Sequence, residues 1–319
     1  MFRIISFLCG VLACCTGVCC AAGWSSLYDE AKTKAEQARL QTAIDVLIQK
    51  EIQPFIPAQQ ATAFGLQAVD LPLEGYRSDP LDFYAQNGHI ILPVRTLLFV
   101  EDLSRAYGWM WSNRFSTKTV DEYLSMLRYR NASDFPGGRY PPPLQAMHIP
   151  DNALADPTVV ETSVRLRRTA YAFMLLHQFA HLQMDHDTGG NRGVSEAQEE
   201  QADRYALNIM KENSATPTGI LLVMYSSMYF ETGTGISLHP VTAQRLEAMA
   251  HFMDGRIGEF IRGRPDKATA ADGIHSIANL LVEASRWLSV RGHQEELQQL
   301  ALKTDASTLQ PRPLPRTTK

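Results

Sequence analysis

The residues that could do chemistry begin with two histidines, His177 and His181, in an apolar stretch at 170–182. In an α-helix this spacing places both imidazoles on one face, close enough to bind the same metal ion. Burying two imidazoles without polar partners would cost several kcal/mol, so something must pair with them. The spacing alone also fits two hydrogen-bonded structural histidines, and the interpretation therefore depends on the rest of the chain.

An acidic segment follows at 199–203 and offers the partners that the histidines need. Glu199 lies on the apolar stripe of its predicted helix, together with Ala202 and Ala206, so it points toward the core. It is the carboxylate best placed to be a third metal ligand. Asp203, one turn later, could accept a hydrogen bond from a ligating imidazole and orient it. A solvated acidic helix face is the alternative interpretation.

Three motifs occur in order: His-x-x-x-His, then Glu-x-x-Ala-Asp, then His239-Pro240 followed by Arg245. Together they resemble the gluzincin zinc metallopeptidases. The nearest kind is the family of CAAX prenyl proteases and their exported, periplasmic quality-control relatives. The resemblance covers about residues 165–250, and its motifs are moderately specific together and weak apart.

The resemblance implies a zincin-like metallopeptidase domain with a zinc cofactor, in which His177, His181 and Glu199 bind the metal. It implies a peptide or protein substrate, whose peptide bond is hydrolysed by zinc-bound water. In the family the His-Pro segment lies close to the metal. His239 and Arg245 therefore become candidates for closing the metal site or for holding substrate and carboxylate.

One residue departs from the family pattern, because Gln178 stands where His-Glu-x-x-His has its glutamate. That glutamate is the general base, and a positioned base is worth roughly 10²–10⁴-fold in rate. Glutamine keeps the shape but cannot accept the proton, so activity should be weakened or lost while zinc binding survives. The protein is then a non-catalytic pseudo-peptidase that binds peptides or envelope proteins, or Glu196 or Glu200 substitutes as the base, or the glutamine is an engineered inactivation.

Two other interpretations stay open. Metzincins need a glycine three residues after the second histidine and a third ligand three residues further on, where this chain has Met184 and Asp187. Methionine is unsuited to that turn. His186 is no better as a ligand, because in a continuing helix it would point about 180° away from His177. The last alternative is a metal-free helical protein whose histidines are structural.

Composition narrows the class of protein. The chain has 319 residues, 45% hydrophobic and 20% charged, which is typical of a soluble globular protein and argues against intrinsic disorder and a multi-span membrane protein. The net charge of −4 with scattered basic residues gives no sign of a nucleic-acid partner. All five cysteines lie before residue 21, so a chain cleaved after Ala22 must hold any metal through histidine and carboxylate groups.

Residues 1–22 predict a signal peptide, with Arg3 before an apolar run and small residues at its end. Cys15 also lies in a loose match to a bacterial lipobox, so a lipoprotein leader stays open. The run is nearly long enough to remain as an anchor helix. In every case the body of the protein is exported, periplasmic or secreted, with membrane association through the leader in the last two.

The pattern of apolar residues and turns around these residues predicts an α+β fold. It is mostly helical, with a small sheet and an active-site helix carrying the two histidines. Asn87-Gly88 between apolar runs predicts a hairpin within an extended region at 60–92. Asp156 as N-cap and Ser195 with Gln198 as a capping box begin the two site helices. Residues 131–156 predict a long loop. Apolar periodicity predicts helices at 24–52, 94–107, 118–130, 157–185, 195–212, 217–230, 240–262 and 272–302.

We therefore divide the chain into four parts: a leader at 1–22, an N-terminal amphipathic helix at 23–55, a zincin-like domain at 56–303 and a disordered tail at 304–319.

Overall fold

The coordinates are those of a computed structural model. The residues it describes are 24–57, 60, 69–75, 80–186, 195–230, 239–305, 307 and 309–315. The leader predicted at 1–22 lies outside these described residues. Within them, no helix combines the length and the apolar character that a membrane span requires.

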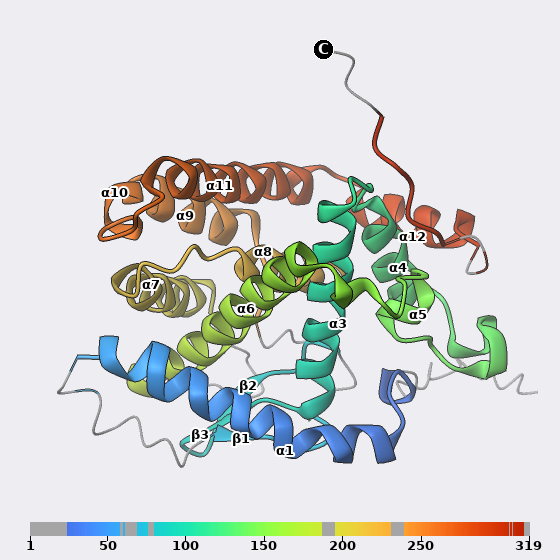
Figure 1. Ribbon diagram of the computed structural model, residues 1–319, viewed down its shortest axis with the longest axis horizontal. Coiled ribbons are helices and arrows are strands. Elements are labelled where there is room, and N and C mark those ends of the chain that lie inside the picture. Colours follow the sequence, from blue (N-terminus) through green and yellow to red (C-terminus); the bar gives the residue numbers. More distant parts are fainter. Residues whose placement is uncertain are drawn as a thin grey trace, which may run out of the picture.

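The fold is mostly helical with one small sheet, as the apolar periodicity predicts (Figure 1). The long helix at residues 157–183 is central, and helices from the N-terminal half and the middle of the chain pack against it. The helices are α1 (Glu30–Leu47), α3 (Val94–Ser112), α4 (Lys118–Tyr129), α5 (Pro143–Ala146), α6 (Pro157–Gln183), α7 (Glu196–Glu212), α8 (Gly219–Phe230), α9 (Ala243–Asp254), α10 (Ile257–Phe260), α11 (Lys267–Ser289) and α12 (His293–Lys303).

The sheet has three short strands in the order β1-β3-β2. Strand β3 (His89–Ile91) pairs in parallel with β1 (Val69–Asp70) and antiparallel with β2 (Tyr84–Gln86). The predicted hairpin is confirmed: Asn87 and Gly88 have φ of 52° and 81°, the left-handed values that a two-residue turn of this type needs.

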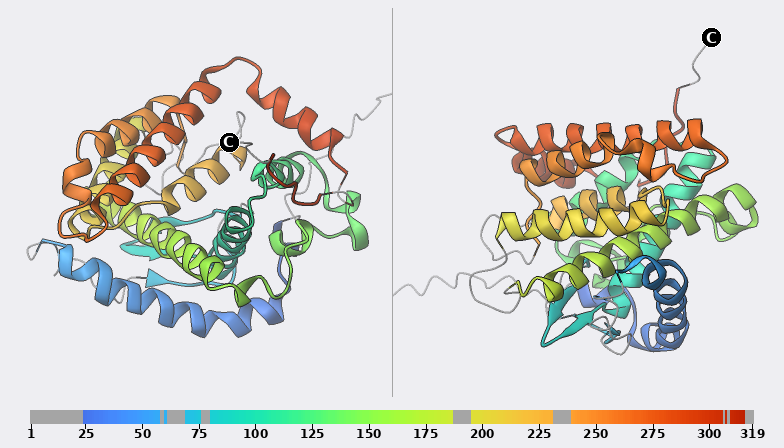
Figure 2. Two further views of the ribbon diagram at one scale, coloured as in Figure 1. Left: turned by 45° about the horizontal axis from the view of Figure 1, so that its top comes forward. Right: turned by 90° about the vertical axis from the view of Figure 1, so that its left-hand side faces the viewer.

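Helix α6 carries the two histidines through the middle of the molecule. It begins as predicted, with the Asp156 side chain accepting a hydrogen bond from the Thr158 amide and Pro157 in the first turn. Its second half is buried on nearly every side, because α3, α7, α8 and the sheet all pack against it. In the right-hand view of Figure 2, α6 lies between the sheet below and α7 above.

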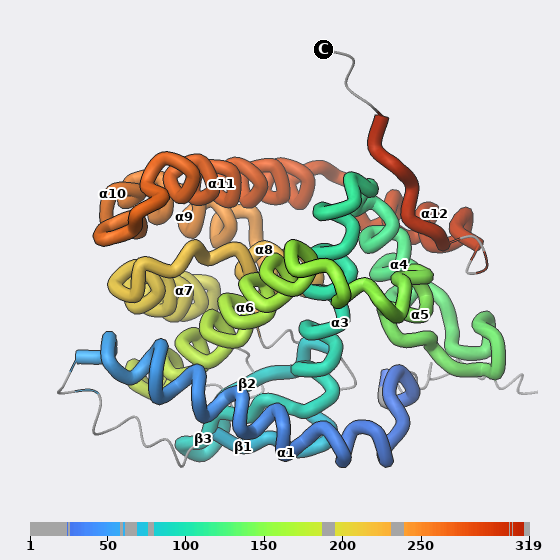
Figure 3. Tube along the Cα trace, viewed as in Figure 1, coloured from blue at the N-terminus to red at the C-terminus, as the bar shows by residue number. Residues whose placement is uncertain are grey.

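Helix α7 holds the acidic segment against α6. It begins at the predicted capping box, in which Ser195 and Gln198 each accept a hydrogen bond from the other's backbone amide. Helix α9 packs on the other side of α7 and begins at Thr242, whose side chain accepts from the Arg245 amide. The trace in Figure 3 shows that α6, α7 and α9 lie one above the other.

Several helix limits differ from the prediction. The helix predicted at 240–262 breaks after Asp254 into α9 and α10, and the one predicted at 272–302 begins earlier and divides into α11 and α12. The second break lies at Gly292, whose φ of 94° is incompatible with a continuing right-handed helix. Helix α3 extends to Ser112, and the loop predicted at 131–156 contains the short helix α5 and three 3₁₀ turns.

The ends of the described chain also pack on the fold. The N-terminal helix forms as α1 and continues into a π-helical turn, Ile48–Ile52. At the other end, part of the segment that we expected to be disordered is ordered. Leu309 is buried, and Pro313 forms a β-bridge with Phe115 between α3 and α4. An apolar anchor near the end of a polar, proline-rich segment is enough to hold it.

Candidate metal centre

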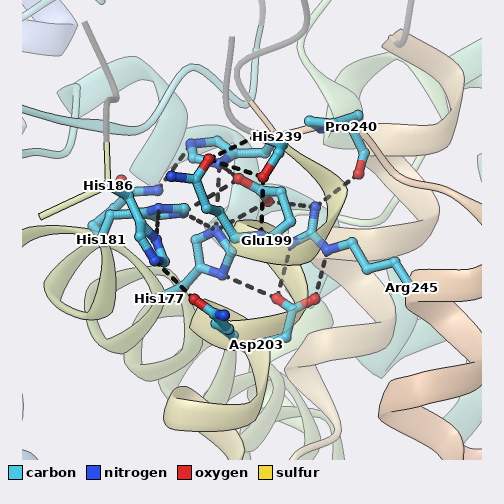
Figure 4. A network of polar contacts seen from close by, with 12 residues as sticks. His177, His181, His186, Glu199, Asp203, His239, Pro240 and Arg245 are labelled. Atoms are coloured by element: carbon cyan, nitrogen blue, oxygen red, sulfur yellow. Dashed lines mark hydrogen bonds and ion pairs between the residues drawn. The ribbon is translucent and has the colours of Figure 1, made fainter. Parts of the chain in front are cut away.

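Four potential metal ligands converge between α6, α7 and the segment that precedes α9 (Figure 4). His177 and His181 come from α6, Glu199 from α7, and His239 from the residues before α9. One donor atom from each lies within 4.8 Å of all the others. The first three side chains are almost fully buried, and His239 is mostly buried. This cluster could hold a metal ion.

The distances between the donor atoms suit a small tetrahedral ion. The Nε2 atoms of His177 and His181 are 3.0 Å apart, and they lie 3.3 and 3.2 Å from the Glu199 carboxylate oxygens. His239 Nδ1 lies 3.0 Å from Glu199 and 3.3 Å from His177 Nε2. Ligands about 2.0–2.1 Å from a tetrahedral zinc lie about 3.3–3.4 Å from one another, so these separations of 3.0–3.3 Å are close to those of a zinc site.

Asp203 and Arg245 orient two of the potential ligands, His177 and Glu199. The Asp203 carboxylate lies 2.9 Å from His177 Nδ1, so its negative charge favours a proton on that nitrogen and leaves Nε2 toward the cluster. The Arg245 guanidinium donates to both oxygens of Asp203 and forms an ion pair with Glu199, with Nη1 2.6 Å from the carboxylate oxygen. Arg245 is itself 1% exposed and also donates to the Pro240 carbonyl. One buried cation therefore positions two carboxylates.

Burial and charge tune the three histidines differently. Burial lowers the pKa of His181 to about 3 and also lowers the pKa of His239, so both imidazoles are neutral at neutral pH. Burial also acts to lower the pKa of His177, but the negative charges of Glu199 and Asp203 outweigh burial, and the pKa of His177 is raised. A neutral imidazole is the form that binds metal.

The two carboxylates stay ionised. Burial favours their neutral forms, but the charge of Arg245 holds the pKa of Glu199 well below its ordinary value and also lowers the pKa of Asp203. In the form that binds metal, with all three histidines neutral, two carboxylates and one guanidinium give this buried group a net charge of −1. A divalent cation is the kind of ligand that such a group attracts.

Gln178 and Phe83 hold His239 over the cluster. The Gln178 amide nitrogen lies 2.9 Å from His239 Nε2, and the Phe83 carbonyl oxygen lies 3.0 Å from the same atom. The His239 ring also stacks on the Phe83 ring with centroids 5.1 Å apart. Gln178 Oε1 is buried and has no hydrogen-bond partner among the described residues. The glutamine therefore faces His239 from the position at which a His-Glu-x-x-His motif has its glutamate.

The two glutamates considered as substitute bases are engaged elsewhere. Glu196 accepts a hydrogen bond from the Thr242 hydroxyl, and Glu200 accepts one from the Gln244 amide at 2.8 Å. Both contacts join α7 to the beginning of α9. These positions give no support to either residue as a replacement for the general base.

His186 corrects an expectation from the sequence. We expected it to point away from His177 if the helix continued, but α6 ends at Gln183 and His186 lies against His181, with Nδ1 atoms 3.0 Å apart. Phe83 also contacts His239, and the sequence gives no sign of this contact, because the hydrogen bond goes to the backbone carbonyl of Phe83 and not to its side chain. The metzincin alternative would place a ligand at Asp187, which lies outside the described residues.

The structure thus brings together all seven residues that the sequence analysis selected for the site. Four of them form the donor cluster: His177, His181, Glu199 and His239. Gln178, Asp203 and Arg245 each contact a member of the cluster. Their roles as ligands or catalytic groups stay predictions.

Comparison with known proteins adds one finding. The model of a family described as Peptidase U49 matches residues 122–263, a range that contains the whole cluster. No curated protein and no solved structure matches the chain. A match to a peptidase family, together with a buried cluster of three histidines and a glutamate, fits a metallopeptidase.

Proposed function

We propose that the protein is an exported zinc metallopeptidase-like protein, in which His177, His181 and Glu199 hold the metal. The observation that carries the proposal is the convergence of these three donors at tetrahedral spacing in a buried site. The match to a peptidase family supports it and points to a peptide or protein as the substrate. Export through the 1–22 leader, with membrane attachment where the leader is kept, is part of the proposal.

Zinc suits this donor set better than other divalent ions. Imidazole nitrogen together with one carboxylate is typical of zinc peptidase sites, whereas calcium and magnesium prefer oxygen ligands alone. When His177 is protonated on both ring nitrogens, the proton on Nε2 faces the Glu199 carboxylate. A metal ion bound to Nε2 would displace that proton. Zinc binding should therefore release a proton.

The residues of the chain would divide the work of peptide hydrolysis. Zinc bound at the site would polarise the scissile carbonyl and lower the pKa of water. Asp203 and Arg245 keep His177 and Glu199 oriented. Gln178 can hydrogen-bond to a substrate or a water molecule but cannot accept a proton. The wild-type rate should therefore be about 10²–10⁴-fold below that of an otherwise identical site with glutamate.

A second candidate function is peptide binding without hydrolysis. It is favoured by His239, whose Nδ1 lies within the donor cluster and would close a fourth coordination position. Closed sites with four protein ligands are typical of structural zinc, while catalytic zinc keeps one position open. The Phe83 carbonyl lies 3.0 Å from His239 Nε2, and a proton donated to it leaves the unshared pair of His239 at Nδ1, which favours the closed arrangement.

The test combines metal analysis with a casein-cleavage assay. Purified wild type should contain one equivalent of zinc, and His177→Ala should contain none. Gln178→Glu should cleave casein at least about 10²-fold faster than wild type. Gln299→Glu, the same change at an exposed position of α12, is the matched control and should behave as wild type.

The outcomes separate the interpretations. Zinc in neither wild type nor His177→Ala would contradict the proposal and favour the metal-free helical protein. Equal cleavage by wild type and Gln178→Glu would show that Gln178 does not limit the reaction and that another base acts. Cleavage only by the double variant Gln178→Glu with His239→Ala would show that His239 closes the site, which favours the binding function for the wild type.

A further inference from the structure

His186 returns to the metal site because α6 ends just before it. Helix α6 ends at Gln183, and Asp185 takes a left-handed conformation with φ of 52°. The His186 amide then donates to the His181 carbonyl at 3.0 Å, which closes the helix end. The ring of His186 consequently lies beside the ring of His181, with centroids 5.1 Å apart. Figure 4 shows the two rings together at the edge of the cluster.

A chain of hydrogen bonds runs from α7 through His186 to His181. The Gln201 side-chain oxygen lies 3.0 Å from His186 Nε2, and His186 Nδ1 lies 3.0 Å from His181 Nδ1. An amide oxygen only accepts hydrogen bonds, so His186 Nε2 carries the proton. Neutral His186 then has its unshared pair at Nδ1, and the proton between the two rings belongs to His181 Nδ1.

This protonation pattern leaves the unshared pair of His181 on Nε2. That atom lies 3.0 Å from His177 Nε2 and 3.2 Å from the Glu199 carboxylate, at the centre of the donor cluster. At His177 the negative charge of Asp203, 2.9 Å from Nδ1, favours the same arrangement. Both histidines of α6 are thus set in the tautomer that binds metal through Nε2.

We propose that His186 is a positioning residue for the metal site, which holds His181 in its ligating tautomer and orientation, and that Gln201 fixes the tautomer of His186. The inference rests on the proposed function, because it concerns the same zinc site. His186 acts through His181 and not as a ligand. Its two ring nitrogens are engaged by His181 and Gln201, and neither belongs to the group of four converging donor atoms.

The experiment measures zinc affinity by competition with a chromophoric chelator. Loss of a partner that orients a ligating histidine costs about 10–100-fold in metal affinity, so His186→Ala should weaken zinc binding by that factor. His186→Gln should restore most of the affinity, because a glutamine side chain can accept from His181 Nδ1 and donate to Gln201. The matched control is His275→Ala, which removes an exposed histidine that hydrogen-bonds Asp254 on another helix.

Melting of the metal-free variants in EDTA shows whether each is folded like the wild type. A folded His186→Ala variant that binds zinc as tightly as wild type would overturn the inference and leave the proposed zinc site intact. Equal weakening by His186→Ala and His186→Gln would also overturn it, because the hydrogen-bond relay would then have no part. Absence of zinc binding in the wild type would overturn the proposed function and this inference together. Weakening in His186→Ala alone supports the inference.

Discussion

Among the described residues Arg245 has the largest fully buried side chain, and its charge neutralises one of two buried carboxylates. Removing one partner of a buried ionic group costs about 3–5 kcal/mol, since the remaining charges lose their compensation. We therefore expect Arg245→Met to lower the free energy of unfolding by about that amount in urea titrations with EDTA present. Zinc should reduce the deficit, because the metal would neutralise Glu199.

The control for Arg245 is Arg262→Met, which removes an arginine with a 68% exposed side chain 3.9 Å from Glu259. Its effect should stay within about 0.5 kcal/mol. A loss below about 1 kcal/mol for Arg245→Met would contradict the view that this guanidinium stabilises the carboxylates of the site.

Asp102 gives the protein a pH dependence that is separate from the metal cluster. Burial raises the pKa of Asp102 from 3.8 to about 6, although the Tyr28 hydroxyl donates to it at 2.9 Å. The folded state therefore prefers the protonated form. This preference stabilises the fold below about pH 4, weakens as the pH rises to about 6, and is absent above that.

Asp102→Asn should consequently stabilise the protein at pH 7.5 by up to about 3 kcal/mol, since each pKa unit corresponds to about 1.4 kcal/mol. The advantage should shrink toward zero near pH 4, where the wild-type carboxyl is neutral as well. Thermal melting at the two pH values measures it, with the exposed Asp272→Asn as control. An equal effect of Asp102→Asn at both pH values would show that titration is not the cause.

The site residues differ in how far the sequence reveals them. His177, His181 and Glu199 follow from spacing and helical phase, because both helices are regular and their apolar stripes are clear. His186 could not be predicted, because its position depends on where α6 ends and on the left-handed Asp185. The contact of His239 with the Phe83 carbonyl has no side-chain signature at all.

At the level of elements, Gly219 allows α8 to approach α6 closely. A Cβ atom at Gly219 would lie 2.1 Å from the Ala170 nitrogen and 2.4 Å from the Leu166 carbonyl oxygen. Both are backbone atoms of α6, so the two helices must separate. We expect Gly219→Ala to destabilise the fold by about 1–3 kcal/mol in urea titrations, as overpacked cores do.

Gly258→Ala is the matched control for Gly219→Ala, because a Cβ at Gly258 in α10 meets nothing within 4 Å. This variant should keep the wild-type stability or gain up to about 1 kcal/mol from the better helix propensity of alanine. Equal effects at the two positions would contradict the idea that the close approach of α8 to α6 is what requires glycine.

The elements themselves were predictable where local signals agree. Asp156 with Pro157, and Ser195 with Gln198, locate the beginnings of α6 and α7 because capping is a local interaction. The breaks before α10 and α12 were missed, since a glycine within an apolar helical pattern is compatible with continuation. Tertiary packing decides such cases, and the apolar stripe of the sequence continues across both breaks.

At the level of the whole molecule, the chain ends are held by contacts distant in sequence. The amide of Ser116 donates to the Arg312 carbonyl, and the amide of Leu314 donates to the Arg114 carbonyl, both at 2.8 Å. Leu309 is 1% exposed in the core beside them. Composition favours disorder in such a proline-rich segment. It does not show that a single leucine of the segment is buried in the core of the fold.

The donor cluster joins three parts of the chain that the unfolded state separates. His177 and His239 are 62 positions apart, and Glu199 lies between them on another helix. A metal that binds only the folded chain stabilises it by RT ln(1 + [L]/Kd), or about 4 kcal/mol at a thousandfold excess over Kd. We expect zinc to raise the melting temperature by several degrees over the value in EDTA. His181→Ala should melt at the same temperature in zinc as in EDTA, because it lacks one of the three proposed zinc ligands. A zinc shift of the same size in His181→Ala would place the bound metal elsewhere in the molecule.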